Sequence, residues 1–403
     1  MTYILSVIFI LLLAAVIHSY VVFPVTLKLI KGLRSEYFYN PENAKDTPAW
    51  SGKVSLIMSC FNEDKVLRDK IACLEKQTFP KGQLNFYIGS DASTDDTNAI
   101  LKAWEKDNKR VRFYPFEARR GKAPVINELA KLAMEEWGTG KDHVLLFTDA
   151  NVLLQEDCIA KMIRHFREPG IGVVDSHMSS VGTSQEGIST SEKAYIQREV
   201  MIKNLEGVLW GTMMGTFGGC YMVRSNAFAY VPEKFLVDDF FITLEAILKG
   251  FGAINDLEAR CFEAVPHEIE EEYRRKRRIS SGNFQNLGYF WPRIRRSSLA
   301  MQYCFISHKV LRWLGPIFVF TAWIISGWLW MWGSSTFGWI FAFLFLGTTA
   351  TLLIDRLLEV MKVHFPWTRH LRYFIWMNIA VFEGFIQYLY GIKSNVWQPP
   401  KRQ

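Results

Sequence analysis

Polar side chains that could bind a polar ligand and a cation follow three apolar segments in the first half of this chain. They are Asn62 and Glu63 after the first segment, Asp91 after the second, and Asp149 with Asn151 after the third. Carboxylate and amide oxygens are the ligands that Mg²⁺ and Mn²⁺ prefer in proteins. Each residue alone is a common turn or helix-cap residue, so the prediction of a site rests on the three positions together.

A second set of ionisable residues lies in the other half of the chain. Asp238 and Asp239 precede a helical pattern over residues 241–250, and a basic block covers residues 274–278. Two adjacent carboxylates that face one pocket repel each other, which would raise the pKa of Asp239. The pair would equally serve as a helix N-cap, and the two roles are compatible. The basic block would clamp an anionic group or, alternatively, lie against anionic lipid.

The elements that would position these residues alternate between strand and helix. Strands are predicted at 53–60, 85–90, 111–116 and 143–148, and helices at 64–77, 95–107 and 125–136. This alternation indicates a parallel α/β sheet. Ligands of such sheets bind beyond the carboxyl ends of the strands, which is where the first set of polar residues lies.

Composition excludes several classes of protein. The 403 residues are 49% hydrophobic and 15% aromatic, which rules out an intrinsically disordered chain and a small disulfide scaffold. The net charge of +7 suits a protein beside a membrane that acts on anionic substrates. No nucleic acid is expected as a partner, because no module of interleaved basic and aromatic residues is found. The cysteines and histidines show no zinc-type spacing.

A membrane anchor is predicted at the N-terminus. Residues 3–30 are almost wholly apolar, which suffices for one spanning helix and exceeds the apolar core of a signal peptide. Lys28, Lys31 and Arg34 lie at or just after the end of this run and no basic residue precedes it. The positive-inside rule therefore puts residue 35 onward in the cytoplasm. We expect a multi-pass protein of the inner or plasma membrane.

Four parts of the chain follow from these patterns. They are an anchor (1–34), a cytoplasmic α/β domain (35–290), an interfacial amphipathic helix (291–312) and C-terminal transmembrane segments (313–403). The third part would alternatively be a packed linker helix. His308, Lys309, Arg312 and Trp313, at the membrane junction, are interpreted as structural anchors.

The last part contains three apolar runs, at 313–333, 337–354 and 373–392. The first two would form an out-and-back hairpin. If the third also crossed the membrane, the basic tail after residue 392 would lie outside, against the positive-inside rule. Either the tail is an exception, or a late segment is re-entrant or interfacial; the last run carries Glu383 and Gln387.

Seven ordered motifs make the chain resemble family 2 glycosyltransferases. Those of the nucleotide-sugar half are CFNE (60–63), SDASTDDT (90–97), RRGKAPVIN (119–127) and FTDAN (147–151). Those of the acceptor half are GGCYMVRSNAF (218–228), VDDFFITLEAILKGF (237–251) and RRKRRISSGNFQNL (274–287). The arrangement is similar to membrane-bound poly-N-acetylglucosamine, hyaluronan and chitin synthases. The resemblance implies a GT-A-type α/β fold, with a nucleotide-sugar-binding, mostly parallel sheet, plus α-helical transmembrane segments.

The resemblance also implies donor-binding residues. Asp91 would hold the uracil or ribose, with Asn62 and Glu63 in the nucleoside pocket and Lys122 near the phosphates or base.

Asp149 and Asn151 occupy the family's Asp-x-Asp positions, so the resemblance makes them ligands of Mg²⁺ or Mn²⁺ on the donor diphosphate. The Asn carbonyl is a weaker and neutral ligand. Arg278 matches the Arg of the family's Gln-x-x-Arg-Trp and would clamp the leaving group.

On the acceptor side, the resemblance makes Asp239 the general base, with Asp238 beside it in the family's Glu position. Gly218 and Gly219 would let backbone approach the acceptor.

Arg275 and Ile279 stand where the family's Gln and Trp would lie, so the resemblance makes them acceptor-binding residues. That Trp stacks on the terminal sugar in processive synthases, so Ile279 departs from the pattern at the acceptor site.

The expected function is inverting transfer from a UDP-sugar to a membrane-associated glycan or lipid acceptor, extending a β-linked polysaccharide. The first alternative is single transfer that makes a glycolipid. The second is an inactive nucleotide-binding partner of a secretion complex. Membrane lipids and accessory secretion proteins are the further expected partners.

Overall fold

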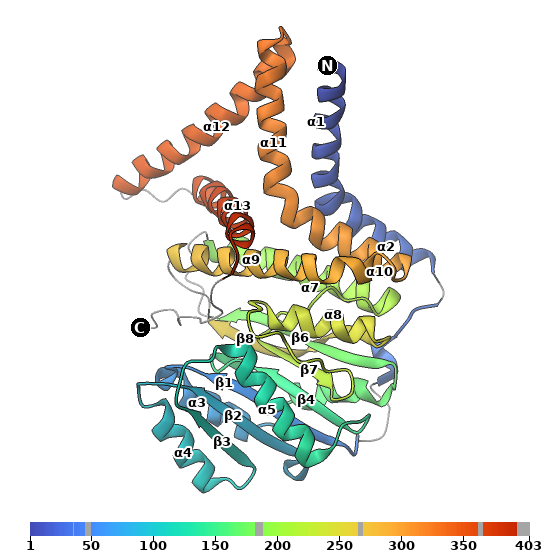
Figure 1. The fold of residues 1–403 in the computed structure, drawn as a ribbon, viewed down its shortest axis with the longest axis vertical. Helices are drawn as coiled ribbons and strands as arrows, with labels where there is room; N and C mark the ends of the chain where they lie inside the picture. The colour runs from blue at the N-terminus through green and yellow to red at the C-terminus, as the bar shows by residue number, and fades with distance from the viewer. Residues whose placement is uncertain (35, 45–49, 182–187, 265–268, 362–365, 393–403) are drawn as a thin grey trace.

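Eight strands form one mixed sheet at the base of the molecule (Figure 1). The computed structural model describes residues 1–34, 36–44, 50–181, 188–264, 269–361 and 366–392. The strands are β1 (Lys53–Cys60), β2 (Leu84–Asp91), β3 (Val111–Phe116), β4 (His143–Thr148), β5 (Val152–Leu154), β6 (Ile171–Val181), β7 (Cys220–Arg224) and β8 (Gly252–Ala264), in the order β3-β2-β1-β4-β7-β6-β8-β5.

The first half of the sheet is parallel, as predicted. The pairs β3–β2, β2–β1 and β1–β4 are parallel, and β1 to β4 lie within one residue of their predicted bounds. The second half differs, because β7 runs antiparallel to both β4 and β6, and β5 runs antiparallel to β8. The parallel arrangement predicted from alternating elements is therefore continuous only up to β4, and in the second half β6 and β8 pair in parallel.

Apolar cores lie on both faces of the sheet. Strand residues alternate between them: Leu56 faces one core and Ile57 the other. The first face is covered by α3 (Asp64–Glu75), α4 (Thr97–Asp107) and α6 (Cys158–Ile163). The second is covered by α5 (Lys122–Trp137), α7 (Ile188–Trp210) and α8 (Asp238–Leu248).

The second core continues into the helices nearest the apolar segments. It includes Phe23 of α2 (Phe23–Leu33), Phe290 of α9 (Ile269–Ile294) and Met301 of α10 (Leu299–Cys304), all nearly inaccessible. In Figure 1, α9 lies across the top of the domain. The α/β domain and the helices α2, α9 and α10 are therefore one packed body.

Three helical stretches are long and apolar enough to cross a membrane: Thr2–Leu33, Leu299–Met331 and Ser335–Leu358. They contain α1 (Thr2–Ile17), α11 (Leu311–Met331) and most of α12 (Ser335–Val360). Helices α1 and α11 rise side by side, and α12 diverges from them (Figure 1). The chain turns between α11 and α12 at Gly333, whose φ of +92° favours glycine.

The stretch 291–312, expected as one interfacial helix, is divided. Its first residues end α9, the chain turns, and the Ser298 hydroxyl accepts a hydrogen bond from the Met301 amide to start α10. A π-helical turn, Phe305–Val310, then leads into α11. Leu299 is 83% exposed, whereas Cys304 and Phe305 are buried. This arrangement corresponds to the packed linker alternative.

The last apolar run forms α13 (Pro366–Leu389), which packs along α9 (Figure 1). The Ser281 hydroxyl donates to the Gly384 carbonyl at 2.8 Å, and Arg277 pairs with Glu383 at 3.4 Å. A Cβ at Gly384 would lie 2.5 Å from that of Ser280, so the two helices approach closely. Helix α13 is not among the three candidate spans of the described residues. The basic tail at 393–403 lies outside those residues.

Candidate active site

A lysine and three carboxylates meet where β4 ends and α5 and α8 begin. Lys122 Nζ, at the start of α5, lies 2.8 Å from Asp149 Oδ1 and 3.6 Å from Asp238 Oδ2. Burial alone would lower the pKa of Lys122, but Asp149, Asp238 and Asp239 outweigh it and raise that pKa. The lysine therefore keeps its positive charge at the centre of the site.

Asp238 and Asp239 are the first two residues of α8, not its N-cap, which is Val237. Carboxylates in a first helical turn are stabilised by the helix dipole. Burial and the adjacent Asp238 nevertheless raise the pKa of Asp239 to about 6, against the opposing effect of Lys122 and Lys203. A carboxyl with this pKa is poised for proton transfer near neutral pH.

The two glycines of the loop before β7 have different surroundings. Gly218 has a φ of +82°, and a Cβ there would lie 3.0 Å from Asp239 Oδ2, so only glycine fits easily beside the carboxylate. Gly219 instead faces Met178, whose Cε would lie 2.2 Å from an added Cβ. Packing therefore explains Gly219, and only Gly218 adjoins the predicted base.

Helix α9 brings Arg278 to the same site. Its Nη1 donates to the Leu236 carbonyl at 3.3 Å. Burial lowers the pKa of Arg278, and the nearby carboxylates, Asp238 and Asp149 among them, act in the opposite direction. Arg278 is thus close enough to Asp149, Asp238 and Asp239 for their charges to act on it.

Arg275 and Ile279 occupy the same helix, one turn apart. Arg275 lies 3.7 Å from Glu263 on β8 and 3.8 Å from Glu272. These contacts place Arg275 near the β8 side of the site, whereas the sequence predicted an acceptor contact. Ile279 is half-buried on α9.

Asp91 shapes the loop that leads into α5. Its carboxylate accepts hydrogen bonds from the Arg120 and Gly121 amides at 2.7 and 3.0 Å, and lies 3.2 Å from Arg119 Nε. The Arg119 guanidinium stacks over the Phe61 ring at 3.2 Å. Asp91 therefore fixes the approach to Lys122.

Asn62 and Glu63 connect the end of β1 to the loop after β2. Asn62, with a φ of +52°, accepts a hydrogen bond from the Thr94 amide at 2.9 Å. The Glu63 amide donates to the Thr97 hydroxyl at 2.9 Å, and Glu63 is buried. Both residues therefore lie at the carboxyl end of β1 and join it to the loop after β2, and their role as nucleoside-binding residues stays a prediction.

Asp149 and Asn151 lie together on the turn after β4. The buried Lys70 ammonium donates a hydrogen bond to the Thr148 hydroxyl, at the end of that strand, at 2.8 Å. Asn151 Nδ2 donates to Glu263 Oε1 at 3.1 Å. Within the described ranges, no three His, Cys, Asp or Glu side chains could enclose a metal ion alone. One carboxylate and one carbonyl fit a cation that takes its other ligands from substrate phosphates and water.

The sequence analysis did not identify a buried ion pair near Asp239, formed by Asp175 and Lys203. Asp175 on β6 and Tyr221 on β7 are opposite each other in the sheet, and Lys203 Nζ of α7 lies 3.7 Å from Asp175 Oδ2. Burial raises the pKa of Asp175 to about 7. The Phe217 amide donates to Asp175 at 3.0 Å, so this pair also holds the loop that contains Gly218.

Charged residues of α7 also contact the linker helix. His308 is buried, with Nδ1 2.7 Å from Glu206 and Nε2 3.0 Å from Glu199. Glu206 accepts a hydrogen bond from the Met214 amide at 3.0 Å. His308, interpreted from the sequence as an anchor at the membrane junction, is therefore a buried link between the start of the second candidate span and the loop before β7.

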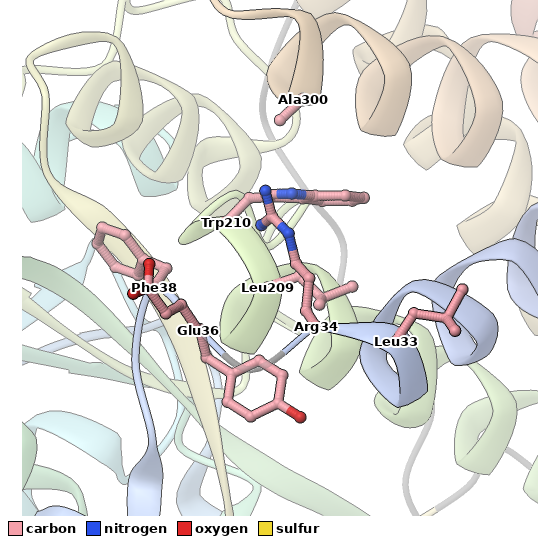
Figure 2. Close-up of a pocket in the computed structure, with 8 residues that line it drawn as sticks. Leu33, Arg34, Glu36, Phe38, Leu209, Trp210 and Ala300 are labelled. Carbon is pink, nitrogen blue, oxygen red and sulfur yellow. The ribbon is translucent and has the colours of Figure 1, made fainter.

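An open cavity of about 590 Å³ lies elsewhere, lined by Leu33, Arg34, Glu36, Tyr37, Phe38, Leu209, Trp210 and Ala300 (Figure 2). A Cβ at Gly252, where β8 begins, would contact the Phe38 ring, whereas Glu263 at the other end of β8 contacts Asn151. The two positions pair with Ile171 and Ser180 of β6, which are nine residues apart, roughly 30 Å. This cavity is distinct from the candidate active site.

Comparison with known proteins agrees with this geometry. The model of "Glycosyl transferase family 2" matches residues 55–230, and that of "Glycosyl transferase family group 2" matches residues 144–354. A poly-beta-1,6-N-acetyl-D-glucosamine synthase of Staphylococcus epidermidis is 24% identical over 62% of this chain. A beta-monoglucosyldiacylglycerol synthase of a Nostoc species is 22% identical over 61%. The matches span 59% and 52% of these relatives' own lengths.

Among solved structures, a mannosyltransferase of Pyrobaculum calidifontis, determined with GDP-Man and Mn²⁺, aligns over 96% of this chain and 99% of its own. The TM-score is 0.67 at 19% identity, which establishes the shared GT-A fold. Since the family group 2 model covers more than half of the sequence, this chain belongs to the family 2 glycosyltransferases, which use nucleotide sugars.

Proposed function

We propose that this enzyme transfers a sugar from a UDP-sugar, with inversion, to a membrane-associated acceptor and so extends a β-linked polysaccharide at the cytoplasmic face. The observation that supports this most is that Lys122 contacts Asp149 at 2.8 Å and Asp238 at 3.6 Å, while the neighbouring Asp239 adjoins Gly218. Lys122 and Asp149 would form the donor side of one site, and Asp239 with Gly218 would form its acceptor side. Helix α9, which carries Arg278, leads through α10 into a candidate span.

On the donor side, Asp149 and Asn151 would hold Mg²⁺ or Mn²⁺ against the diphosphate. The bound cation would offset charge on the departing nucleoside diphosphate. Lys122 and Arg278 would offset the rest of that charge, Arg278 through two parallel hydrogen bonds. Asp91, Asn62 and Glu63 would form the nucleoside side of the pocket.

On the acceptor side, Asp239 would remove the proton of the acceptor hydroxyl. The hydroxyl oxygen then bonds to the anomeric carbon from the face opposite the diphosphate, and the bond to the diphosphate breaks. A positioned base accelerates such a step by about 10²–10⁴-fold. Gly218 would let the acceptor reach the carboxylate.

The pH dependence follows from the raised pKa of Asp239, about 6. The base works only when ionised, so kcat should fall about tenfold per pH unit below that value. Asp238→Asn removes the neighbouring negative charge and should move the acidic limb to lower pH. Initial rates of UDP release between pH 4.5 and 8 measure the acidic limb of the wild type and that of the Asp238→Asn variant. An unmoved limb in the variant would contradict the assignment of Asp239 as the base.

A topology with three spans accompanies the proposal. The N-terminus would lie outside, α11 would lead outward and α12 inward, and α13 would stay beside α9. This topology returns the basic tail to the cytoplasm, in agreement with the positive-inside rule. An impermeant thiol reagent applied to intact cells should label Ser334→Cys and spare Gln403→Cys. Labelling of Gln403→Cys would indicate a fourth span.

Single transfer to a lipid is the second candidate product. It is supported by Ile279, which replaces the sugar-stacking Trp, and by a membrane part with few candidate spans. The relative from Nostoc is named as a glycolipid synthase.

One experiment distinguishes the candidate products. The purified enzyme in bilayer nanodiscs of native lipid, with Mn²⁺, is supplied with UDP-glucose, UDP-N-acetylglucosamine, UDP-galactose or UDP-glucuronate. A product retained on a sizing column supports the polysaccharide, and an organic-extractable monoglycosylated lipid supports the glycolipid. Nucleotide binding without UDP release from any donor would overturn the proposed transfer and favour an inactive partner.

A further inference from the structure

The amide of Asn151 is oriented by a residue far away in the sequence. Its Nδ2 donates to Glu263 Oε1 at 3.1 Å. Strand β5 begins directly after Asn151, and its first residue, Val152, is paired with Glu263 in the sheet. Because the nitrogen and oxygen of a carboxamide diverge from one planar carbon, the hydrogen bond from Nδ2 directs the Asn151 carbonyl oxygen away from Glu263 Oε1. This oxygen accepts no hydrogen bond from the part of the chain that the structure describes.

Glu263 also brings a negative charge close to the donor site. Its side chain is 24% exposed and lies 3.7 Å from Arg275. An Asp-x-Asp pair would carry two negative charges on the cation ligands, whereas here Asp149 carries one and Asn151 none. The negative charge that a second aspartate would carry is therefore present on Glu263 of β8, which is hydrogen-bonded to Asn151.

Sheet packing does not require the Asn151–Glu263 hydrogen bond. Three consecutive backbone pairs, from Val152–Glu263 to Leu154–Cys261, already join β5 to β8. The side-chain contact adds a fixed orientation of the Asn151 amide to that pairing. A partner that fixes a ligand's orientation and basicity affects metal affinity without touching the metal.

We propose that Glu263 is a positioning residue for the divalent cation. It holds the Asn151 carboxamide with the carbonyl oxygen available as a ligand, and it supplies the charge that a second aspartate would carry. The inference rests on the proposed function, because it assumes that a cation and a nucleoside diphosphate bind at Asp149.

Mn²⁺ binding to the full-length protein tests this role independently of turnover. Free Mn²⁺ is followed by electron paramagnetic resonance in titrations with UDP, with GDP and without nucleotide. Glu263→Ala should weaken Mn²⁺ binding about 10- to 100-fold, as is usual for residues that orient a metal ligand. Glu263→Gln keeps an acceptor for Asn151 but loses the charge, so its loss should be smaller.

A charge exchange provides the sharper test. In Asn151→Asp/Glu263→Gln, the new glutamine donates to the new aspartate, and the negative charge moves onto the ligand itself. This double variant should bind Mn²⁺ within about threefold of the wild type or more tightly. Glu258→Gln, on the same strand but paired with Arg164 at 2.9 Å, is the matched control and should leave affinity unchanged.

Wild-type Mn²⁺ affinity in Glu263→Ala, or a double variant that binds no better than Glu263→Gln, would overturn the inference. Failure of the proposed function gives a different result, since the wild type itself would then show no nucleotide-dependent Mn²⁺ binding. A thermal unfolding scan of each variant identifies those that do not fold.

Discussion

Replacing Asp239 with Asn is expected to lower sugar transfer about 100- to 10,000-fold and to stabilise the folded protein. The loss of transfer follows because Asn cannot take up the acceptor's proton, a contribution of about 10²–10⁴-fold. The Gly218 backbone adjoining this carboxylate leaves room for an isosteric amide, so donor binding should persist. UDP release and calorimetric UDP binding, measured on the same preparation, separate the two effects.

The gain in stability follows from the sign of the pKa shift. The folded-state pKa of Asp239, about 6, exceeds its ordinary value of 3.8, so folding disfavours the ionised form. Below pH 3.8 this free-energy cost is absent, because the carboxyl is protonated in both the folded and the unfolded protein. Above a pH of about 6 the carboxyl is ionised in both, and the whole cost lowers the stability of the folded protein. The Asn variant should therefore gain about 1–3 kcal/mol at pH 7.5 and little at pH 4. A pH-independent difference in the free energy of unfolding would contradict this electrostatic origin.

Replacing Asp149 with Asn should lower kcat/KM about 1,000-fold and abolish the response to Mn²⁺. This chain has only one carboxylate in the two Asp-x-Asp positions, so the variant would retain two neutral amides there. Cation stabilisation of a departing diphosphate is worth several kcal/mol, which corresponds to a loss of this size. Lys122 also loses its 2.8 Å partner and would turn toward Asp238.

The measurement is the Mn²⁺ dependence of UDP release. Asp157→Asn serves as the control, because Asp157 pairs with Lys161 on α6, outside the candidate site. A variant at Asp149 that keeps an unchanged Mn²⁺ half-saturation would show that the cation binds elsewhere.

The first half of the domain was predictable from the sequence because β1 and β4 are largely apolar runs and helical patterns separate the strands. β1, β3 and β4 have their predicted bounds, and the polar residues at the strand ends meet at one edge. The second half was less predictable, because β7 and β5 pair antiparallel with strands that are distant in sequence. No local pattern specifies such a partner.

The charged residues of α7 show why part of the site was missed. Glu199, Lys203 and Glu206 fall on one helical face, which in sequence is typical of a solvent-exposed surface. In the structure that face is buried against Asp175 and His308. Burial of these charges depends on partners in β6 and in the linker helix, which periodicity within α7 does not reveal.

The anomeric configuration of the product tests the central claim most directly. Purified enzyme in nanodiscs is given Mn²⁺ and a ¹³C-labelled UDP-sugar, and the product is examined by NMR. A single displacement with Asp239 as base predicts a new β-glycosidic linkage formed from the α-linked donor, with release of one UDP per sugar transferred. Retention of the α configuration, or transfer that persists undiminished in Asp239→Asn, would contradict the account.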